Sequence, residues 1–582
     1  MGLIGTHLEL DASKVAVGTV LAVVIVHALV LPLIRFALRP YSATARALPG
    51  PPVAHWFAGS WPAHAYTSGR IGQHLQETIA EYGPVCAMTA LGRKTSIILG
   101  DHKAANYVLL QKVYARSPLR VSILRRHVGR GLLTEEGDTH RRQRKIANPA
   151  FTGEAVLNMA PIIQDKTALF MDRLRKRIAA VPKADGPEGE RYGTRIDLAR
   201  DFQCVTLDVI GEAGFAYSFD SLTKDEHDFT PLQAAINGSM GLISRRSLYS
   251  ILRLAFDKPV TALGRLLGVK EQLELDRTWA VIENVCLDLV QRAKKDAQAN
   301  ADGSSSSAAR DVLSLMVRAN ISPDLRPNQR MSNEELIHTV PVLLLAGHET
   351  SSATLSFACQ RLMDGENGER IQQRLRDELR HADGWESDAT ILDSLPYLEA
   401  VVRETLRQNP PIRRMSREAT GNDIIPLSRP ITLRDGSKTN QIRVSKGQNI
   451  EFPVFYMNTC EELWGLDGKD FKPERWLPEG HEFQDGTSRM SPEVSDLKGV
   501  WSHLMTFGAG PQQCIGVRLA LLEIKYVLAT LIAAYDILPP QLPGEEPIKM
   551  DYLTPIAAMP VIIGQEDKGH AMPVRLRPIA AA

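Results

Sequence analysis

The side chain with the most specific chemistry in this chain is the thiol of Cys514, which lies in the turn FGAGPQQCIG at residues 507–516. The long apolar pattern that follows predicts a helix. Its N-terminus would present backbone N–H groups and a positive dipole end, which stabilise a thiolate. The glycines allow close approach to a large planar ligand, and a thiolate in that position suits an axial ligand of haem iron. A buried structural cysteine fits the turn equally well.

A second group of reactive side chains lies in the segment AGHETS at residues 346–351. A mid-helix glycine, Gly347, leaves room for whatever faces it, and Thr350 could direct a hydroxyl into that space. Glu349 beside it could transfer protons from solvent, and the pair would suit protonation of a bound oxygen species. The alternative is a packing notch with Glu349 at the surface.

A third group consists of charges that could pair. Glu404 and Arg407 stand three positions apart on a stretch with a helical pattern, and Arg475, in the segment FKPERW, could join them. On its own, E-x-x-R usually means a surface ion pair that contributes less than about 1 kcal/mol to stability.

Mostly helical elements would position these residues. A capping box at residues 332–335 begins a helix that runs to about residue 363, and its apolar middle, VPVLLLAG, predicts burial on all sides. Pro341 inside this helix should bend it. Residues 95–99 predict a short strand, and residues 424–455 predict a small sheet beside the helical body.

Composition excludes several other classes of protein. The 582 residues carry a formal net charge of +1 and no strongly charged tail, so a nucleic-acid partner is not expected. Six widely scattered cysteines without a C-x-x-C pair disfavour a disulfide scaffold or a zinc site.

The N-terminal region predicts a membrane anchor. Residues 15–34 carry no charge and are long enough, as a helix, to cross a bilayer core of roughly 30 Å. Residues 1–14 would be lumenal, because the arginines that follow the span favour the cytosol for the rest. A cleaved signal peptide is the alternative. Residues 35–55 would form a basic, proline-rich hinge that holds the catalytic body, residues 56–582, away from the membrane.

Together and in this order, A-G-x-E-T, E-x-x-R, P-E-R-W and the cysteine turn resemble the cytochrome P450 family of haem-thiolate monooxygenases, especially its fungal microsomal branch. The resemblance covers nearly the whole chain from the anchor onward. It implies a mainly α fold, in which a large helical domain with a long buried central helix accompanies a small β-rich subdomain. It also implies an enzyme that uses haem b and inserts one oxygen atom of O2 into its substrate.

The resemblance also implies roles for individual residues. Cys514 would be the proximal iron ligand, Thr350 and Glu349 would deliver protons during oxygen activation, and Glu404, Arg407 and Arg475 would form a structural triad that holds the cysteine turn. The residues expected to contact haem are Phe507, Gly508, Gly510, Gln512 and Gly516 in the turn, Ala346 and Gly347 in the central helix, and His140, Arg144 and Arg417 near the propionates.

Two positions depart from the family pattern. His140 stands where the W-x-x-x-R element has tryptophan, and Gln512 stands where the turn usually carries arginine or histidine. Glutamine can hydrogen-bond a propionate but adds no charge, so Arg144 and Arg417 would take a larger share of haem binding. We therefore expect Gln512→Arg to tighten haem retention.

Electrons must come from another protein, since only 68 residues follow Cys514 and they contain no flavin or nucleotide unit. The resemblance implies NADPH-cytochrome P450 reductase in the endoplasmic reticulum membrane, with a single-pass anchor and the catalytic domain in the cytosol. A cluster of basic residues could steer an acidic reductase to the proximal side, or could be an ordinary solvated face. Its members are Arg125, Arg126, Arg130, Arg141, Arg142 and Lys145.

The substrate is expected to be a hydrophobic small molecule such as a terpenoid, lipid, aromatic secondary metabolite or xenobiotic, because the segments expected to line the pocket are mostly apolar. Leu345, Ile412 and Met415 are candidate lining residues, and Arg413 or Arg414 could hold a carboxylate if either faces the pocket. The sequence does not identify the substrate. Two alternatives are a haem-thiolate isomerase or dehydratase that uses no O2, and a non-catalytic membrane haem protein. Neither needs the acid and hydroxyl of the A-G-x-E-T element.

Overall fold

The structure is a computed structural model that describes residues 43–53, 59–60, 71–89, 95–181, 191–224, 228–244, 247, 249, 253, 257–301, 311–477, 500–501, 503–553 and 557–579. Its helices are α3 (Ala43–Ala47), α5 (Ile71–Tyr82), α6 (His102–Leu110), α7 (Pro118–Val128), α8 (Gly137–Ala147), α9 (Gly153–Leu157), α10 (Ala160–Ala180), α12 (Ala199–Phe215), α13 (Pro231–Ser244), α15 (Asp257–Leu266), α16 (Lys270–Ala301), α17 (Val312–Ile321), α18 (Asn333–Leu362), α19 (Gly365–His381), α20 (Ala389–Ser394), α21 (Pro396–Gln408), α22 (Val454–Met457), α23 (Glu461–Trp464) and α25 (Val517–Ala534). Short 3-10 turns include η3 (Asn148–Phe151), η5 (Pro473–Trp476) and η6 (Gly510–Gln512).

Within the described residues the strands are short and form five separate sheets. They are β1 (Val85–Thr89), β2 (Thr95–Leu99), β3 (Tyr114–Ala115), β4 (Thr194–Asp197), β5 (Arg414–Ala419), β6 (Asp423–Thr432), β7 (Lys438–Val444), β8 (Asn449–Pro453), β9 (Val500–Trp501), β10 (Leu504–Ala509), β11 (Tyr535–Leu538), β12 (Met550–Leu553), β13 (Met559–Ile562) and β14 (Pro573–Pro578). The largest sheet has the order β1-β2-β8-β5-β3, and only its β2–β8 pair is parallel. The predicted strand at 95–99 and the predicted sheet at 424–455 are both confirmed.

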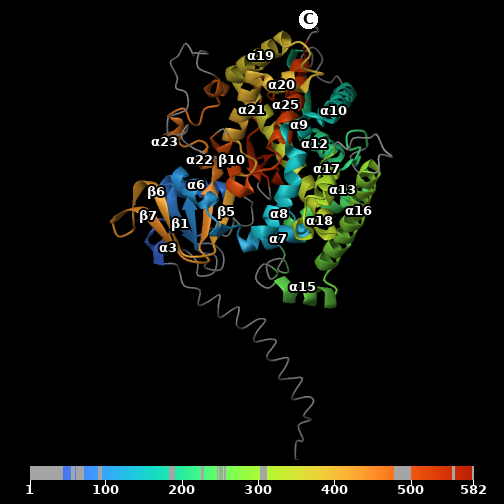
Figure 1. Cartoon of the computed structure of the whole chain (residues 1–582). Helices are drawn as coiled ribbons and strands as arrows, with labels where there is room; N and C mark the ends of the chain where they lie inside the picture. The colour runs from blue at the N-terminus through green and yellow to red at the C-terminus, as the bar shows by residue number, and fades with distance from the viewer. Residues whose placement is uncertain are drawn as a thin grey trace, which may run out of the picture.

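The largest sheet and the β6–β7 pair lie on one side of the helical body. Figure 1 shows β1, β5, β6 and β7 at the left of the view and the long helices at the right. The early helix α6 packs against the late strand β6, so segments more than 300 residues apart lie side by side. This arrangement, a mainly helical body with small sheets, agrees with the fold that the sequence predicts.

The long central helix, α18, begins where the capping box predicts. Ser332 Oγ accepts from Glu335 N at 3.1 Å, and Glu335 Oε2 accepts from Ser332 N at 2.8 Å. The helix continues through Pro341 to Leu362. It is buried on nearly all sides because α12, α16, α21 and α25 pack against it.

The described part of the predicted hinge contacts the folded body. Leu48 is buried in the sheet-side core, Ala87 N donates to Pro49 O at 2.8 Å, and Arg434 donates to the carbonyls of Leu48 and Gly50 at 2.8 and 2.6 Å. This part of residues 35–55 therefore packs on the folded body instead of spacing it from the membrane. The segment packs there because β1 and Arg434 supply N–H donors for its backbone carbonyl groups.

In the part of the chain that the structure describes, no helix combines the length and the apolar character that crossing a membrane requires. The predicted N-terminal segment 1–14, the predicted span 15–34 and the hinge up to residue 42 lie outside the described residues.

Candidate functional site

The cysteine turn connects β10 to α25 through the 3-10 turn η6. Cys514 N donates to Phe507 O at 2.9 Å, which closes the loop. Gly508 and Gly510 have φ of 71° and 70°, in the left-handed region that favours glycine. At Gly510 a Cβ atom would lie 2.6 Å from Leu109 O, so only glycine fits there without displacing α6.

Cys514 differs from the other cysteines in its accessibility. It is exposed, whereas the other five are buried. Although the side chain is exposed, desolvation by the protein around it raises the pKa of its thiol, and the Gly516 backbone N–H and the charge of Arg144 act in the opposite direction. A bound metal cation would remove the proton of such a thiol outright. Cys514 also borders a depression of about 570 Å³, shared with Arg144, Phe151, Trp501, Gln513, Ile515 and Val517.

The central helix is open at one short stretch. Residues 336–345 and 351–359 of α18 are buried, but Ala346 to Thr350 between them are partly exposed. Burial raises the pKa of Glu349 to about 7. Thr350 Oγ1 donates to Ala346 O at 2.8 Å. An acid that is half ionised near neutral pH thus lies beside a hydroxyl at an opening in an otherwise buried helix, as proton transfer requires.

The structure gives Gly347 a packing role, and its contact with haem stays a prediction. A Cβ atom at Gly347 would lie 2.7 Å from Ile210 Cγ1 of α12, so the glycine serves close packing of two helices. Ala346 and Thr350, four residues apart and joined by a hydrogen bond, share the remaining face. The spacing A-G-x-E-T does not reveal which of these residues faces a neighbouring helix.

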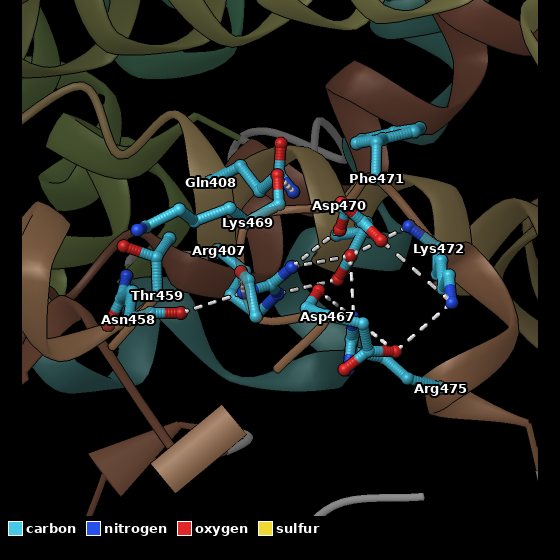
Figure 2. Close-up of polar contacts among 12 residues, drawn as sticks. Arg407, Gln408, Asn458, Thr459, Asp467, Lys469, Asp470, Phe471, Lys472 and Arg475 are labelled. Atoms are coloured by element: carbon cyan, nitrogen blue, oxygen red, sulfur yellow. Dashed lines mark hydrogen bonds and ion pairs between the residues drawn. The ribbon is translucent and has the colours of Figure 1, made fainter. Parts of the chain in front are cut away.

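Glu404, Arg407 and Arg475 come together as predicted, and all three are buried. Figure 2 shows the two arginines of this group. Arg407 donates to Glu404 through Nε at 2.8 Å and Nη2 at 2.7 Å, and Arg475 Nε donates to Glu404 Oε1 at 3.1 Å. Burial alone would raise the pKa of Glu404, but the two guanidinium groups hold it below its usual range.

The triad is connected to the cysteine turn through Asn458. Arg407 Nη1 donates to Asn458 O at 3.0 Å, as Figure 2 shows. The Asn458 side chain then accepts from Met505 N at 3.1 Å and donates to Thr506 Oγ1 at 2.9 Å. Thr506 Oγ1 donates to Leu406 O at 2.8 Å. Since Met505 and Thr506 belong to β10, the triad fixes the strand that leads into the turn.

Cationic side chains converge where propionates are expected. Burial and the positive charges of Arg116, Arg144 and Arg417 together lower the pKa of His140 to about 4. Burial also lowers the pKa of Arg417 to about 10, and its guanidinium donates only to Ser416 O, at 2.9 Å, among the described residues. Buried cations with so few partners are costly, so the site requires anions, and the two carboxylates of haem fit this requirement.

Gln512 does not face this space as a free donor. Its Nε2 donates to Glu136 Oε2 at 2.6 Å, and Glu136 also pairs with Arg116 at 3.2 Å. Sequence reasoning missed Glu136 and Arg116, and no spacing could have found the contact, because 376 positions separate Glu136 from Gln512.

The other candidates are more scattered. Leu345 packs with Val128 of α7, while Ile412 and Met415 are partly exposed. Arg414 pairs with Glu451 at 3.2 Å, and Arg413 is held between the rings of Phe455 and Tyr552, at 5.2 and 4.0 Å from their centroids.

Acids largely neutralise the predicted basic cluster. Arg125 and Arg130 pair with Glu135, Arg141 with Asp138, and Arg142 with Glu335. The cluster therefore presents a smaller positive field than its count of arginines suggests.

Comparison with known proteins agrees with this site. The family model described as "Cytochrome P450" matches residues 49–560, and the chain belongs to the cytochrome P450 family. It is similar to Cytochrome P450 monooxygenase 128 of Postia placenta, with 31% identity over 93% of this chain and 94% of that protein. It is also similar to Cytochrome P450 monooxygenases claP and claO of Ampulloclitocybe clavipes, with 31% and 33% identity over 87% of this chain and 88% of each relative.

More particularly, the chain is a haem-thiolate monooxygenase of the fungal branch of the family. Members use haem with a cysteine thiolate ligand and receive electrons from NADPH through a reductase. Their reaction takes O2 and, in general, a hydrophobic substrate.

Proposed function

We propose that this protein hydroxylates, or otherwise oxidises with one atom of O2, a hydrophobic small molecule, and that Cys514 is its iron ligand. The observation that carries the assignment is the pair of openings in an otherwise buried interior. One is at Cys514, and the other is at Ala346 to Thr350 of α18. Helix packing links the two positions, because α18 contacts α25, which begins three residues after Cys514.

The residues around the openings have distinct tasks. Haem, when bound, supplies the redox chemistry, to which the thiolate contributes electron density that favours O–O cleavage. Glu349 exchanges protons at its carboxyl, and Thr350 holds its hydroxyl oriented through the bond to Ala346 O. His140, Arg144 and Arg417 are proposed to bind the propionates, and the triad of Glu404, Arg407 and Arg475 to fix the turn.

We further propose that residues 15–34 anchor the protein in the endoplasmic reticulum membrane, with the catalytic domain in the cytosol and NADPH-cytochrome P450 reductase as its partner. The length of the uncharged run and the arginines after it support this topology. Protease protection of the N-terminus in sealed microsomes, with the catalytic domain digested, is the expected result. Full digestion of both parts would contradict it.

The carbon-monoxide difference spectrum tests the central assignment. The ferrous wild-type protein should show the red-shifted Soret band of a thiolate-ligated haem, and Cys514→Ser should lose it. Cys460→Ser is the matched control, because Cys460 is the N-cap of α23, where serine is favoured. A wild-type spectrum without the band, or a band that survives in Cys514→Ser, would refute the ligand. NADPH-dependent O2 consumption coupled to product tests the monooxygenase activity.

A further inference from the structure

Side chains of the open stretch of α18 hydrogen-bond to the carbonyl groups of the same helix. Thr350 Oγ1 donates to Ala346 O at 2.8 Å, and His348 Nδ1 donates to Leu344 O at 2.9 Å. Such bonds compete with the backbone ladder of a helix and tend to bend it. Because they lie within one helix, however, they do not fix the position of the open stretch relative to the rest of the protein.

A donor from another helix also reaches this stretch. Thr206 of α12 is fully buried, and its Oγ1 lies 3.1 Å from His348 O. The same oxygen lies 2.8 Å from Phe202 O and 3.4 Å from Gln203 O on its own helix, so its single hydrogen is shared. The contact with His348 joins residues 142 positions apart and ties α12 to the backbone of the open stretch.

The same face of α12 packs closely against the preceding residue of α18. Ile210 follows Thr206 by one helical turn and therefore lies on the same side of α12. A Cβ atom at Gly347 would lie 2.7 Å from Ile210 Cγ1. Helix α12 thus contacts two consecutive residues of α18, Gly347 by close packing and His348 by a hydrogen bond. These contacts lie immediately before Glu349.

The carboxyl of Glu349 is sensitive to small movements of this stretch. Burial alone raises its pKa to about 7, and no charged side chain among the described residues contributes to the shift. When desolvation is the only cause, the pKa depends directly on how much water reaches the carboxyl. Contacts that hold the stretch open therefore help to set the protonation of Glu349.

We propose that Thr206 is a positioning residue for proton transfer, because its hydrogen bond to His348 O keeps α18 open beside Glu349 and Thr350. The proposal rests on the proposed function and deepens it by naming a residue that acts through α18 and not on the substrate itself. The rival role is purely structural, in which the Thr206 hydroxyl only stabilises α12 through its bond to Phe202 O.

Infrared titration of the haem-loaded enzyme tests the proposal without a substrate. The readout is the C=O stretching band of protonated Glu349, isolated by subtracting the spectrum of the matching Glu349→Gln variant, which removes the bands of all other carboxyl groups. Thr206→Val keeps the shape of the side chain but lacks the hydroxyl. The stretch should then close over Glu349, and the pKa should rise by about half a unit to one unit, as the loss of one hydrogen bond allows.

Two variants serve as controls. Thr206→Ser retains the hydroxyl and should restore the wild-type pKa of Glu349. Thr167→Val removes another buried hydroxyl, whose bond to Ile163 O at 2.7 Å stays within its own helix, and should leave that pKa unchanged. Thr206→Ala provides a second variant without the hydroxyl if Thr206→Val does not retain haem.

An unchanged or lower pKa of Glu349 in Thr206→Val would overturn the proposal, and so would an equal shift in Thr167→Val. A lower Tm of Thr206→Val without a shift of this pKa would assign Thr206 the structural role and would likewise overturn it. Failure of the proposed function is distinguishable, because it would appear as a missing thiolate band in the wild-type carbon-monoxide spectrum.

Discussion

Replacing Gln512 with arginine tests how the cysteine turn contributes to haem binding. If Gln512 met a propionate directly, the new cation would act on it with or without Glu136. The structure instead has Gln512 donating to Glu136 at 2.6 Å, while Glu136 also holds Arg116 at 3.2 Å. The introduced arginine should therefore pair with Glu136 first, and should affect haem mainly by cancelling a negative charge near the propionates.

The size of the effect follows from the exposure of this pair. A fully buried pair at 4 Å would gain several kcal/mol, but the Glu136 side chain is 31% exposed and the Arg116 side chain 20%, so about 1 kcal/mol is realistic. Gln512→Arg should then slow haem loss about fivefold, since 1.4 kcal/mol is a factor of ten. In a Glu136→Gln background the same arginine is free to reach a propionate, and the slowing should be at least about tenfold.

The assay is haem transfer to excess apomyoglobin for the wild type, both single variants and the double variant. Gln513→Arg places the same charge one residue away and should change the rate little. Equal effects of Gln512→Arg with and without Glu136 would refute the indirect role and restore direct contact with a propionate. Unchanged or faster haem loss in both backgrounds would refute any electrostatic role for position 512.

Four further predictions concern single groups. Because burial raises the pKa of Glu349 to about 7, product formed per NADPH should fall as pH rises through 7, and Glu349→Gln should remove this dependence. Glu404→Gln should destabilise the protein by about 3 kcal/mol or more, measured as lost haem content and a lower Tm, because two buried guanidinium groups lose their counter-ion. Gly347→Ala should lower Tm, because its Cβ would lie 2.7 Å from Ile210 Cγ1, and Ile210→Ala should restore part of the loss. Burial raises the pKa of Glu523 to about 8, so the native state keeps a proton that the unfolded state loses above pH 4.5. The free energy of unfolding of the wild type should therefore fall relative to that of Glu523→Gln as pH rises from 4.5 to 8, by up to about 4 kcal/mol. An unchanged difference across that range would contradict a protonated Glu523.

Local patterns in the sequence were sufficient for much of this site. The capping box located the start of α18, because its two hydrogen bonds join residues only three apart. The glycines at 508 and 510 indicated a tight turn, and both have positive φ. The pair Glu404 and Arg407 was recognisable because residues three apart share one helix face.

Other features depend on contacts between distant segments. The close packing of Gly347 against Ile210 of α12 could not be predicted from its neighbours in sequence, because Ile210 lies on a distant segment. The sequence predicts a spacer at Leu48 to Gly50, whereas the structure shows this segment hydrogen-bonded to β1 and Arg434. The sequence suggests that Arg125, Arg141 and Arg142 belong to a positive patch, whereas the structure shows each of them paired with an acid.

The sequence by itself therefore determined the family, the cysteine that can bind iron, and the acid and hydroxyl on the central helix, because these depend on residue type and short spacing. The tertiary structure alone decided the partner of Gln512 and the helix against which Gly347 packs. Each of these depends on which charges and surfaces meet between segments far apart in the sequence, and the free energy of a charge or a cavity is set by all the groups around it.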